Sequence, residues 1–540
     1  MKKQYIYLIV SIFAFILFYK VLINEQIKNT IGYNICSIEE IENMEATLRK
    51  VNKEETGSLL FNEVKVPYYS YPGIYYLPVN VNEDWLWKYS FTTENKSMKI
   101  YWSEDPYWFD IETAIEISHP FSFFVTDGNI GTKGNIIFTG LPMLVLDELE
   151  EFGEEKKFAS MKIFDPFSSD DYGYQIHENF VICELRGSTS RIFPKKAYNL
   201  TLCDERRKPL KKSLLGMRSD DEWKLNSLYS DTSKIREKIC IDLWNEIAAS
   251  TETPYDAGTK MEYLEIIIDE EYCGLYGLME PIDYKQLSLN KEEDVLYKAT
   301  TWPDRGNKDL TSLYKGAQEY CGQTIKTAGR TITRKLWNPM CEYVEMTGIK
   351  NQETIDNDAL KYITEYMDMD NFLAVDFFIQ AMRATDNLYK NQYVVADIQK
   401  NGEYKLWRVP WDLNFSLGDR FTEEERDLTW FDESSATEIL KDHLLSEKLL
   451  DFGNVDFIDT VNQKWKKLRN GILSPTNVQR IAYQQNTILI KSGAYNRDSV
   501  YWYKEYREIE VDDILRWYNM RMECLDIHYN SYINTYEVNE

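Results

Sequence analysis

Residues 385–418 read TDNLYKNQYVVADIQKNGEYKLWRVPWDLNFSLG. Two runs within this stretch, 392–397 and 404–409, are rich in apolar and β-branched residues and predict strands. Asn401-Gly402 lies between them, and both residues accept the positive φ angles of a type I′ turn. We therefore expect an antiparallel hairpin, which brings the residues before its first strand next to those after its second.

Three polar side chains lie at the joined ends of this hairpin. Asp386 and Asn391 stand five residues apart before the first strand, and Asp412 follows the second strand just beyond Pro410-Trp411. Carboxylate and amide oxygens are the ligands that a hard divalent cation prefers, and a hydroxyl nucleophile needs a nearby carboxylate. The stretch thus predicts a divalent-cation site for phosphate chemistry. The alternative for Asp386 is that it only ends the helix before it.

The segments upstream supply a rigid base and a set of cations. Residues 369–382 are apolar nearly all round, which is typical of a buried helix, and this helix ends next to the hairpin. A loop rich in cations and hydroxyls, RGSTSRIFPKK (186–196), connects two predicted strands. Guanidinium and ammonium groups are what a polyphosphate requires, although lysines in such a loop can equally form the solvated edge of a strand.

The composition is that of a large folded protein. The chain has 540 residues, 44% of them hydrophobic, which is enough for two to four domains. Its formal net charge of −26 argues against broad nucleic-acid binding, because a phosphate backbone needs a basic face. The eight Cys form no C-x-x-C pair and the four His have no common spacing, so neither a disulfide framework, a zinc site nor histidine-based hydrolysis is indicated.

The N-terminus carries an apolar run, Tyr5 to Ile23, which follows two lysines and is interrupted only by Lys20. The run predicts an uncleaved signal anchor that leaves the rest of the chain on the outer side of the membrane. A cleaved signal peptide is the alternative, although no small-x-small cleavage site follows. A membrane-anchored, extracytoplasmic protein is therefore expected.

The rest of the sequence falls into regions that differ in their predicted secondary structure, and the expected fold class is α+β. Short β-like runs separated by turn signals give way to strands that alternate with helices, and then to charged and aromatic helices. The order of parts from the cationic loop to the hairpin is that of a protein kinase, without a G-x-G-x-x-G-x-V, His-Arg-Asp or Asp-Phe-Gly motif. The expected parts are a signal anchor or signal peptide (1–24), a stalk (25–60), a small all-β domain (61–180), a kinase-like core (181–420, with an insertion at about 291–355) and a helical C-terminal part (421–540).

Several stretches together resemble the CotH family, the spore-coat-type atypical kinases. They are RGSTSRIFPKKAYNLTL (186–202), DTSKIREKICIDLW (231–244), YLEIIIDEEYCGLYGLMEPID (263–283), and DNLYKNQYVV with LWRVPWDLNFSLGD (386–395 and 406–419). The resemblance implies a two-lobed, kinase-like fold and an extracytoplasmic protein Ser/Thr kinase. It also implies transfer of the ATP γ-phosphoryl group with Mg²⁺ or Mn²⁺ to a protein hydroxyl, the substrate being a coat or cell-surface protein.

The resemblance also implies roles for individual residues. Asp386 is expected to orient the substrate hydroxyl, and Asn391, Asp412 and Asn414 stand at the positions of the metal site. Glu280 stands where a kinase hinge would be, and Tyr198 and Trp407 are candidates to stack on adenine, with core packing as the alternative for Trp407. The expected nucleotide- and phosphate-binding residues are Arg186, Ser190, Arg191, Lys195, Lys196, Tyr198, Glu280 and Trp407.

Asn414 is the main departure from the family pattern, which usually has a second acid there. Losing one negative charge weakens a divalent-cation site. A pseudokinase that acts in surface binding or spore-coat assembly is therefore the alternative function. A carbohydrate-binding or glycan-processing protein is a third, which rests on Trp85, Trp87, Trp102 and Trp108. For the kinase we expect one cleft that the three hairpin-end residues share with Lys195 or Lys196.

Overall fold

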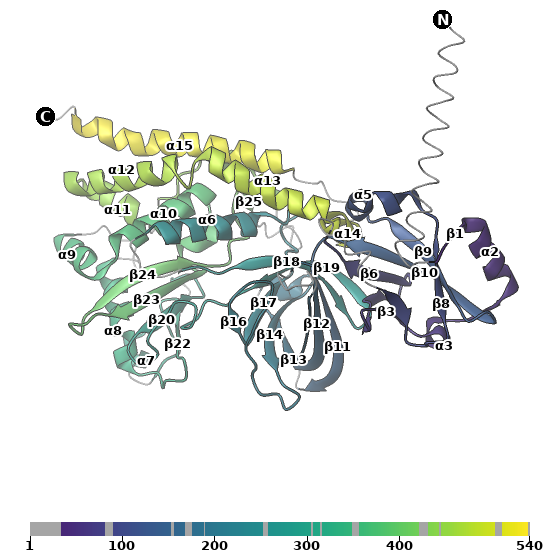
Figure 1. Cartoon of the computed structure of the whole chain (residues 1–540). Helices are drawn as coiled ribbons and strands as arrows, with labels where there is room; N and C mark the ends of the chain where they lie inside the picture. Colours follow the sequence, from purple (N-terminus) through teal and green to yellow (C-terminus); the bar gives the residue numbers. More distant parts are fainter. Residues whose placement is uncertain are drawn as a thin grey trace, which may run out of the picture.

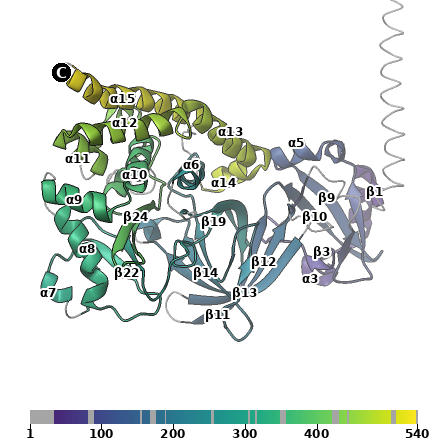
Figure 2. The ribbon, with the colours of Figure 1, turned by 60° about the vertical axis from the view of Figure 1, so that its left-hand side comes forward.

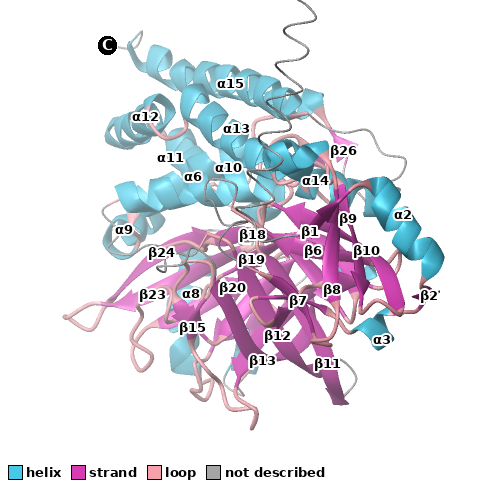
Figure 3. Ribbon diagram, turned by 45° about the vertical axis from the view of Figure 1, so that its right-hand side comes forward, coloured by secondary structure: helices cyan, strands magenta, loops and turns pink. Residues whose placement is uncertain are grey.

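The structure is a computed structural model and has a mixed α+β fold. Strands fill one side of the molecule and most of the helices gather on the other (Figures 1 and 3). The described residues are 34–80, 90–152, 156–167, 175–187, 189–251, 257–303, 306–313, 316–347, 356–420, 430–441, 444–502 and 510–537.

The membrane anchor that formed part of the expected fold class is contradicted. Across the described ranges, no helix is both long and apolar enough to cross a bilayer. Even the 27-residue α15 (Val511–Glu537) begins with acids and packs against other helices. The same finding contradicts the membrane-anchored localisation. Residues 1–24, from which both predictions were made, lie outside the described part of the chain.

The N-terminal part is a seven-stranded sheet with short helices, α2 (Ile38–Thr47), α3 (Lys53–Thr56) and α5 (Ile111–Glu116). A reciprocal capping box between Ser37 and Glu40 starts α2, so residues expected to form a stalk belong to this layer. The strands are β1 (Asn34–Cys36), β8 (Lys99–Ser103), β9 (Pro120–Thr126), β10 (Ile130–Thr139), β6 (Ile74–Pro78) and β5 (Tyr68–Tyr69), with β2 (Arg49–Lys50) paired to β10. A second, three-stranded sheet is formed by β4 (Val64–Lys65), β3 (Leu59–Phe61) and β7 (Phe91–Thr93).

Two tryptophans of this part have a structural role. Trp102 and Trp108 are 1% and 5% exposed and meet edge to face, with ring centroids 5.5 Å apart in the core. Neither ring is free to stack on a sugar. These two residues therefore do not support the hypothesis of a carbohydrate-binding protein. Trp85 and Trp87 lie outside the described residues.

A closed barrel forms the centre of the molecule, and the parallel pairing of its first strand with its last closes it. Buried aliphatic side chains such as Leu144, Leu202 and Leu278 fill the inside. The N-terminal sheet ends at residue 139 and the barrel begins at residue 143. The first two strands of the barrel therefore lie in the range, 61–180, that was expected to form the separate all-β domain. The strands are β11 (Met143–Phe152), β12 (Lys156–Asp165), β13 (Gln175–Arg186), β14 (Ala197–Cys203), β17 (Glu222–Asn226), β19 (Glu271–Met279) and β18 (Met261–Ile268).

The predicted hairpin is confirmed as β23 (Gln392–Ile398) and β24 (Tyr404–Pro410), at the edge of a five-stranded sheet. The turn differs from the expected type I′. Only Gly402 takes a positive φ, 84°, and the Gln399 amide donates to the Glu403 carbonyl, so the connection spans three residues. The expected insertion supplies the rest of this sheet, namely β20 (Val295–Ala299), β21 (Glu319–Tyr320) and β22 (Gln323–Lys326).

Helices cover the barrel and this sheet in two layers (Figure 2). The helix predicted at 369–382 is confirmed as α10 (Met369–Met382), and all its residues from Asn371 onward are buried. It contacts β24 on one side and outer helices on the other. The larger helices are α6 (Arg236–Ser250), α8 (Arg334–Met346), α9 (Asn357–Tyr366), α11 (Leu445–Phe452), α12 (Val455–Asn470), α13 (Pro475–Lys491), α14 (Ala494–Trp502) and α15.

Candidate active site

A cavity of about 630 Å³ opens where the end of β13, the start of α6 and the ends of the β23–β24 hairpin come together. Asp386, Asn391, Asp412 and Asn414 all line it. The hairpin thus brings the predicted acid, amide and second acid to one place. We call this space the catalytic cavity.

The backbone at the hairpin ends holds these side chains in place. Asn391 and Asp412 both adopt left-handed conformations, with φ of 57° and 60°. Asn and Asp tolerate this region better than other non-glycine residues. The buried amide of Asn387 donates to the carbonyls of Asn391 and Trp411, each at 2.8 Å, and so ties the two ends together. Asn387 was not among the predicted residues, because its role depends on a strand twenty residues away.

Asp386 faces a cation in the same short segment. The ammonium of Lys390 lies 2.8 Å from a carboxylate oxygen of Asp386, and the two side chains are 29% and 24% exposed. Both residues line the catalytic cavity. An ammonium at this distance sets the orientation of the carboxylate.

Glu237, on the first turn of α6, is a third acid of the catalytic cavity. Burial, with the Asp412 carboxylate nearby, raises the pKa of Glu237 to about 8. The amide nitrogen of Asn226 donates to it. At neutral pH this carboxyl group is therefore largely protonated.

The polar atoms at the hairpin ends fit a hard cation. Their oxygens belong to the Asp412 carboxylate and to the amides of Asn391 and Asn414, and oxygen-only donor sets suit Mg²⁺ or Mn²⁺. The Asn414 amide nitrogen donates to the Ser230 hydroxyl at 3.2 Å, which fixes the orientation of this side chain. Within the described residues, no group of three or more His, Cys, Asp or Glu is arranged to hold a metal ion by itself.

The expected lysines do not reach the catalytic cavity. Lys195 is 1% exposed, and its ammonium donates to the Asp498 carboxylate and to the Leu275 carbonyl, both at 2.5 Å. Lys196 donates to the Arg191 carbonyl at 2.7 Å. Neither lysine lines the cavity, so the shared cleft lacks the expected ammonium group. The reason is the buried carboxylate of Asp498, which is about 300 residues away and invisible to local sequence patterns.

Only some of the other residues expected to bind the nucleotide line the catalytic cavity. Arg186 and Ser190 line the catalytic cavity, whereas the guanidinium of Arg191 is directed to the Leu185 carbonyl at 3.0 Å. The remaining three do not line it: Tyr198 packs against the barrel core, Glu280 is buried and accepts a hydrogen bond from the Arg218 amide at 2.8 Å, and Trp407 is 2% exposed in the main core. The core-packing alternative for Trp407 is therefore the observed one.

A cluster of cations lies beside the catalytic cavity, and of its four members only Arg186 lines the cavity itself. Arg186 at the end of β13, Lys224 in β17, Lys298 in β20 and Lys326 in β22 converge from the barrel and the five-stranded sheet. The ring of Trp411 lies 6.0 Å from the Arg186 guanidinium and 5.9 Å from the Lys224 ammonium. We call these four residues the cation cluster.

In the described part of the chain, no member of the cation cluster forms an ion pair, although Glu222 acts on Lys224 and Asp412 on Lys298 from a greater distance. Burial and the neighbouring cations lower the pKa of Lys224 to about 7 and that of Lys298 to about 8. Nη1 of Arg186 is buried and has no hydrogen-bond partner within the described ranges. Like charges held together in a partly buried place are unfavourable until an anion joins them. The only sequence signal was a lysine inside each of two apolar strands, which is too common to be specific.

A family model described as "CotH kinase protein" matches residues 183–525. This span begins within β13, ends within α15 and contains all the residues that line the catalytic cavity. No curated protein matches the chain.

Proposed function

Because this chain belongs to the CotH kinase family, we propose that it transfers the γ-phosphoryl group of ATP to a Ser or Thr hydroxyl of a protein, with a divalent metal. The observation that supports this most is the meeting of Asp386, Asn391 and Asp412 in one cavity beside the cation cluster. A kinase needs these parts together: a carboxylate for the hydroxyl, oxygen ligands for a metal, and cations for phosphates.

Each group has a definite task in this proposal. The carboxylate of Asp386 accepts the hydrogen bond of the substrate hydroxyl and orients it, while Lys390 fixes that carboxylate. Asp412, with the amides of Asn391 and Asn414, would hold the metal, which supplies neutralisation of phosphate charge. Arg186, Lys224 and Lys298 receive the remaining phosphate oxygens. The substrate we propose is a coat or cell-surface protein with an accessible Ser or Thr.

The direct test is phosphate transfer from γ-labelled ATP by the purified full chain. We expect metal-dependent label on Ser or Thr, either on the protein itself or on added protein, and loss of the label with a chelator. ATP should also raise the melting temperature when Mg²⁺ or Mn²⁺ is present. Absence of both label and melting shift with either metal would reject the proposal.

A pseudokinase that serves in coat assembly is the second candidate. Asn414 in place of an acid favours it, because one negative charge fewer weakens metal binding. The two candidates differ in one result: the pseudokinase shows a nucleotide-dependent melting shift without transfer of label. Asn414→Asp then separates them further, since it should raise the transfer rate of a weak kinase by strengthening the metal site.

We expect the affinity for a non-hydrolysable ATP analogue to fall as the pH rises from 7 to 9. Lys224 has a pKa of about 7 in the free protein, and a bound polyphosphate raises it. Below pH 7 the ammonium is already protonated, whereas above it binding must also take up a proton, at a cost of up to about tenfold in affinity per pH unit. Titration calorimetry at several pH values measures this.

Lys224→Arg is the matched control for the pH series. Its guanidinium stays charged throughout this range, so the slope should flatten, while titration of the nucleotide itself is unchanged. Lys224→Met should weaken binding at pH 6.5 by about 10- to 100-fold, the usual effect of losing a charged hydrogen bond. Identical slopes in the parent and in Lys224→Arg would show that Lys224 does not contact the phosphates.

A further inference from the structure

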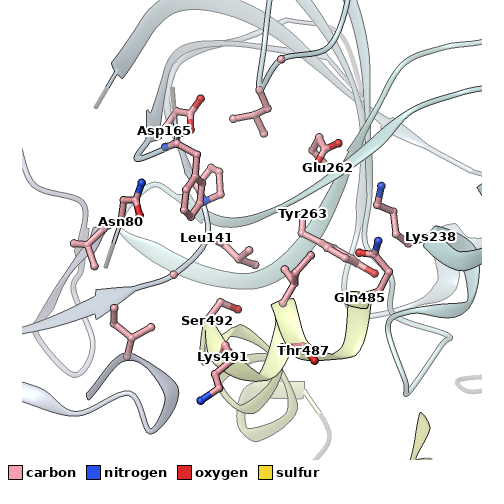
Figure 4. A pocket seen from close by; sticks show the side chains of 18 of the residues that line it. Asn80, Leu141, Asp165, Lys238, Glu262, Tyr263, Gln485, Thr487, Lys491 and Ser492 are labelled. Atoms are coloured by element: carbon pink, nitrogen blue, oxygen red, sulfur yellow. Dashed lines mark hydrogen bonds between the residues drawn. The ribbon is translucent and has the colours of Figure 1, made fainter. Parts of the chain in front are cut away.

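A second cavity, of about 1180 Å³, lies against a different face of helix α6 (Figure 4). Glu237 of this helix lines the catalytic cavity, whereas Lys238 and Asp242, one turn apart, line the second. The other walls come from α5 and the segments that follow β6 and β10, from the barrel and from α13. The two cavities share no lining residue. We call the larger one the rear cavity.

Two acids on the barrel wall of the rear cavity form no ion pair within the described residues. Asp165, at the end of β12, is 6% exposed, and one of its oxygens accepts from the Phe167 amide at 3.0 Å. Its other oxygen has no hydrogen-bond or ion-pair partner in the described part of the chain. The carboxylate of Glu262, in β18, has none there either. Burial raises the pKa of both groups and outweighs the opposing effect of the cations around them.

The cations that act on the two acids are His177 for Asp165, and Lys238 and Lys260 for Glu262. The two lysines that line the rear cavity pair with other acids. The Lys238 ammonium lies 2.8 Å from the Asp242 carboxylate. The Lys491 ammonium lies 2.8 Å from Glu116 and 3.6 Å from Glu112. Neither lysine forms an ion pair with Asp165 or Glu262 in the described residues. Among the described residues, therefore, no cation lies within ion-pairing distance of either acid of the barrel wall.

The opposite wall adds an independent acceptor. Gln485 in α13 is 4% exposed, and its amide nitrogen donates to Asp242 at 2.9 Å. Its carbonyl oxygen is buried and has no hydrogen-bond partner among the described residues. A buried acceptor of this kind is unfavourable unless a donor reaches it. Figure 4 shows Gln485 across the opening from Asp165.

The remaining lining and the size point to an organic ligand. Apolar side chains, among them Leu141 and Ile488, line the same space. Its volume is at the upper end of small-molecule sites, which span about 300–1,000 Å³. A bare metal ion would leave these apolar surfaces uncovered. An aliphatic chain with ammonium groups meets both the acceptors and the apolar lining.

We propose that the rear cavity binds a linear aliphatic polyamine, with its ammonium groups paired to Asp165 and Glu262 and its methylene chain against Leu141 and Ile488. Gln485 accepts a further N–H bond from the ligand. This site is separate from phosphate transfer and holds whether or not the chain is an active kinase.

Titration calorimetry of the full chain with spermidine at physiological salt tests this. We expect one saturable site and no binding of 1,8-octanediol, which has a similar chain without charge. Asp165→Asn/Glu262→Gln should weaken spermidine binding at least tenfold. The matched control is Glu39→Gln/Glu42→Gln, which removes two exposed acids from α2 and should leave the affinity unchanged.

Glu262→Gln alone guards against misfolding of the double variant, since Glu262 is only partly buried; it should weaken binding several-fold at an unchanged melting temperature. Three results would overturn the proposal. They are no saturable binding, equal loss in the Glu39/Glu42 control, or acid-dependent binding of a lysine-rich peptide in place of spermidine, which would make the cavity a docking site for a basic protein segment.

Discussion

We expect phosphate transfer to fall by about 10²- to 10⁴-fold when Asp386 is replaced by Asn, the range that a positioned acid or base contributes. The amide keeps the shape of the carboxylate but cannot accept the proton of the substrate hydroxyl. ATP binding should be retained, because Arg186, Lys224 and Lys298 are untouched. Label transfer and analogue binding, measured on the same preparation, check both statements.

Asp412→Ala is the informative partner of this variant. It removes the carboxylate expected to hold the metal, so it should lose both transfer and the metal-dependent part of nucleotide binding. The Asp386 side chain is 24% exposed, so its replacement should cost less than about 1 kcal/mol of stability. Transfer at the parental rate in Asp386→Asn would contradict the role given to this carboxylate, whatever the behaviour of Asp412→Ala.

Asp498→Ala should destabilise the protein by about 3–5 kcal/mol, which is the usual result of removing one partner from a buried ion pair. The Asp498 carboxylate in α14 lies 2.5 Å from the Lys195 ammonium and 3.2 Å from the Lys234 ammonium, and all three side chains have no exposed surface. It also accepts from the Leu275 amide at 2.8 Å. The variant leaves two ammonium groups and one amide without this acceptor. Urea denaturation measures the loss.

Two further variants separate charge from packing in this cluster. Lys195→Met/Lys234→Met/Asp498→Leu removes all the charges together and should recover most of the stability, because an apolar replacement of a buried ionic group is often neutral or stabilising. Glu365→Ala removes half of an exposed pair with Lys361 and should change stability by less than about 1 kcal/mol. If Asp498→Ala were as mild as Glu365→Ala, the cluster would not hold α14 to the barrel.

Local sequence patterns were sufficient to predict the hairpin and helix α10. An alternating strand, a glycine at the turn and an all-round apolar helix are features that neighbouring residues decide by themselves. They also placed Asp386, Asn391 and Asp412 together, because the hairpin fixes which residues meet at its ends. The predicted two-residue turn was one residue too short, since Gly402 alone supplies the positive φ there.

Local sequence patterns could not predict the contacts between segments that are distant in the sequence. The basic loop contains both Lys195 and Arg186, and nothing local shows that Asp498 draws the first into the core while the second keeps a free nitrogen. Lys224 and Lys298 come from strands about seventy residues apart, and only the packing of the barrel on the five-stranded sheet makes them neighbours. Charge clusters assembled by tertiary structure leave no repeat or spacing in the sequence.

The closed barrel sets the limits within which this protein can be cut or recombined. The family match begins at residue 183, inside β13, so a fragment with that boundary loses β11, β12 and most of β13. It would expose the free edges of β14 and β18, and unpaired edges invite intermolecular strand pairing and aggregation. The smallest piece that keeps the barrel whole begins near residue 141, ahead of β11, and exchange of catalytic parts between relatives must carry these strands along.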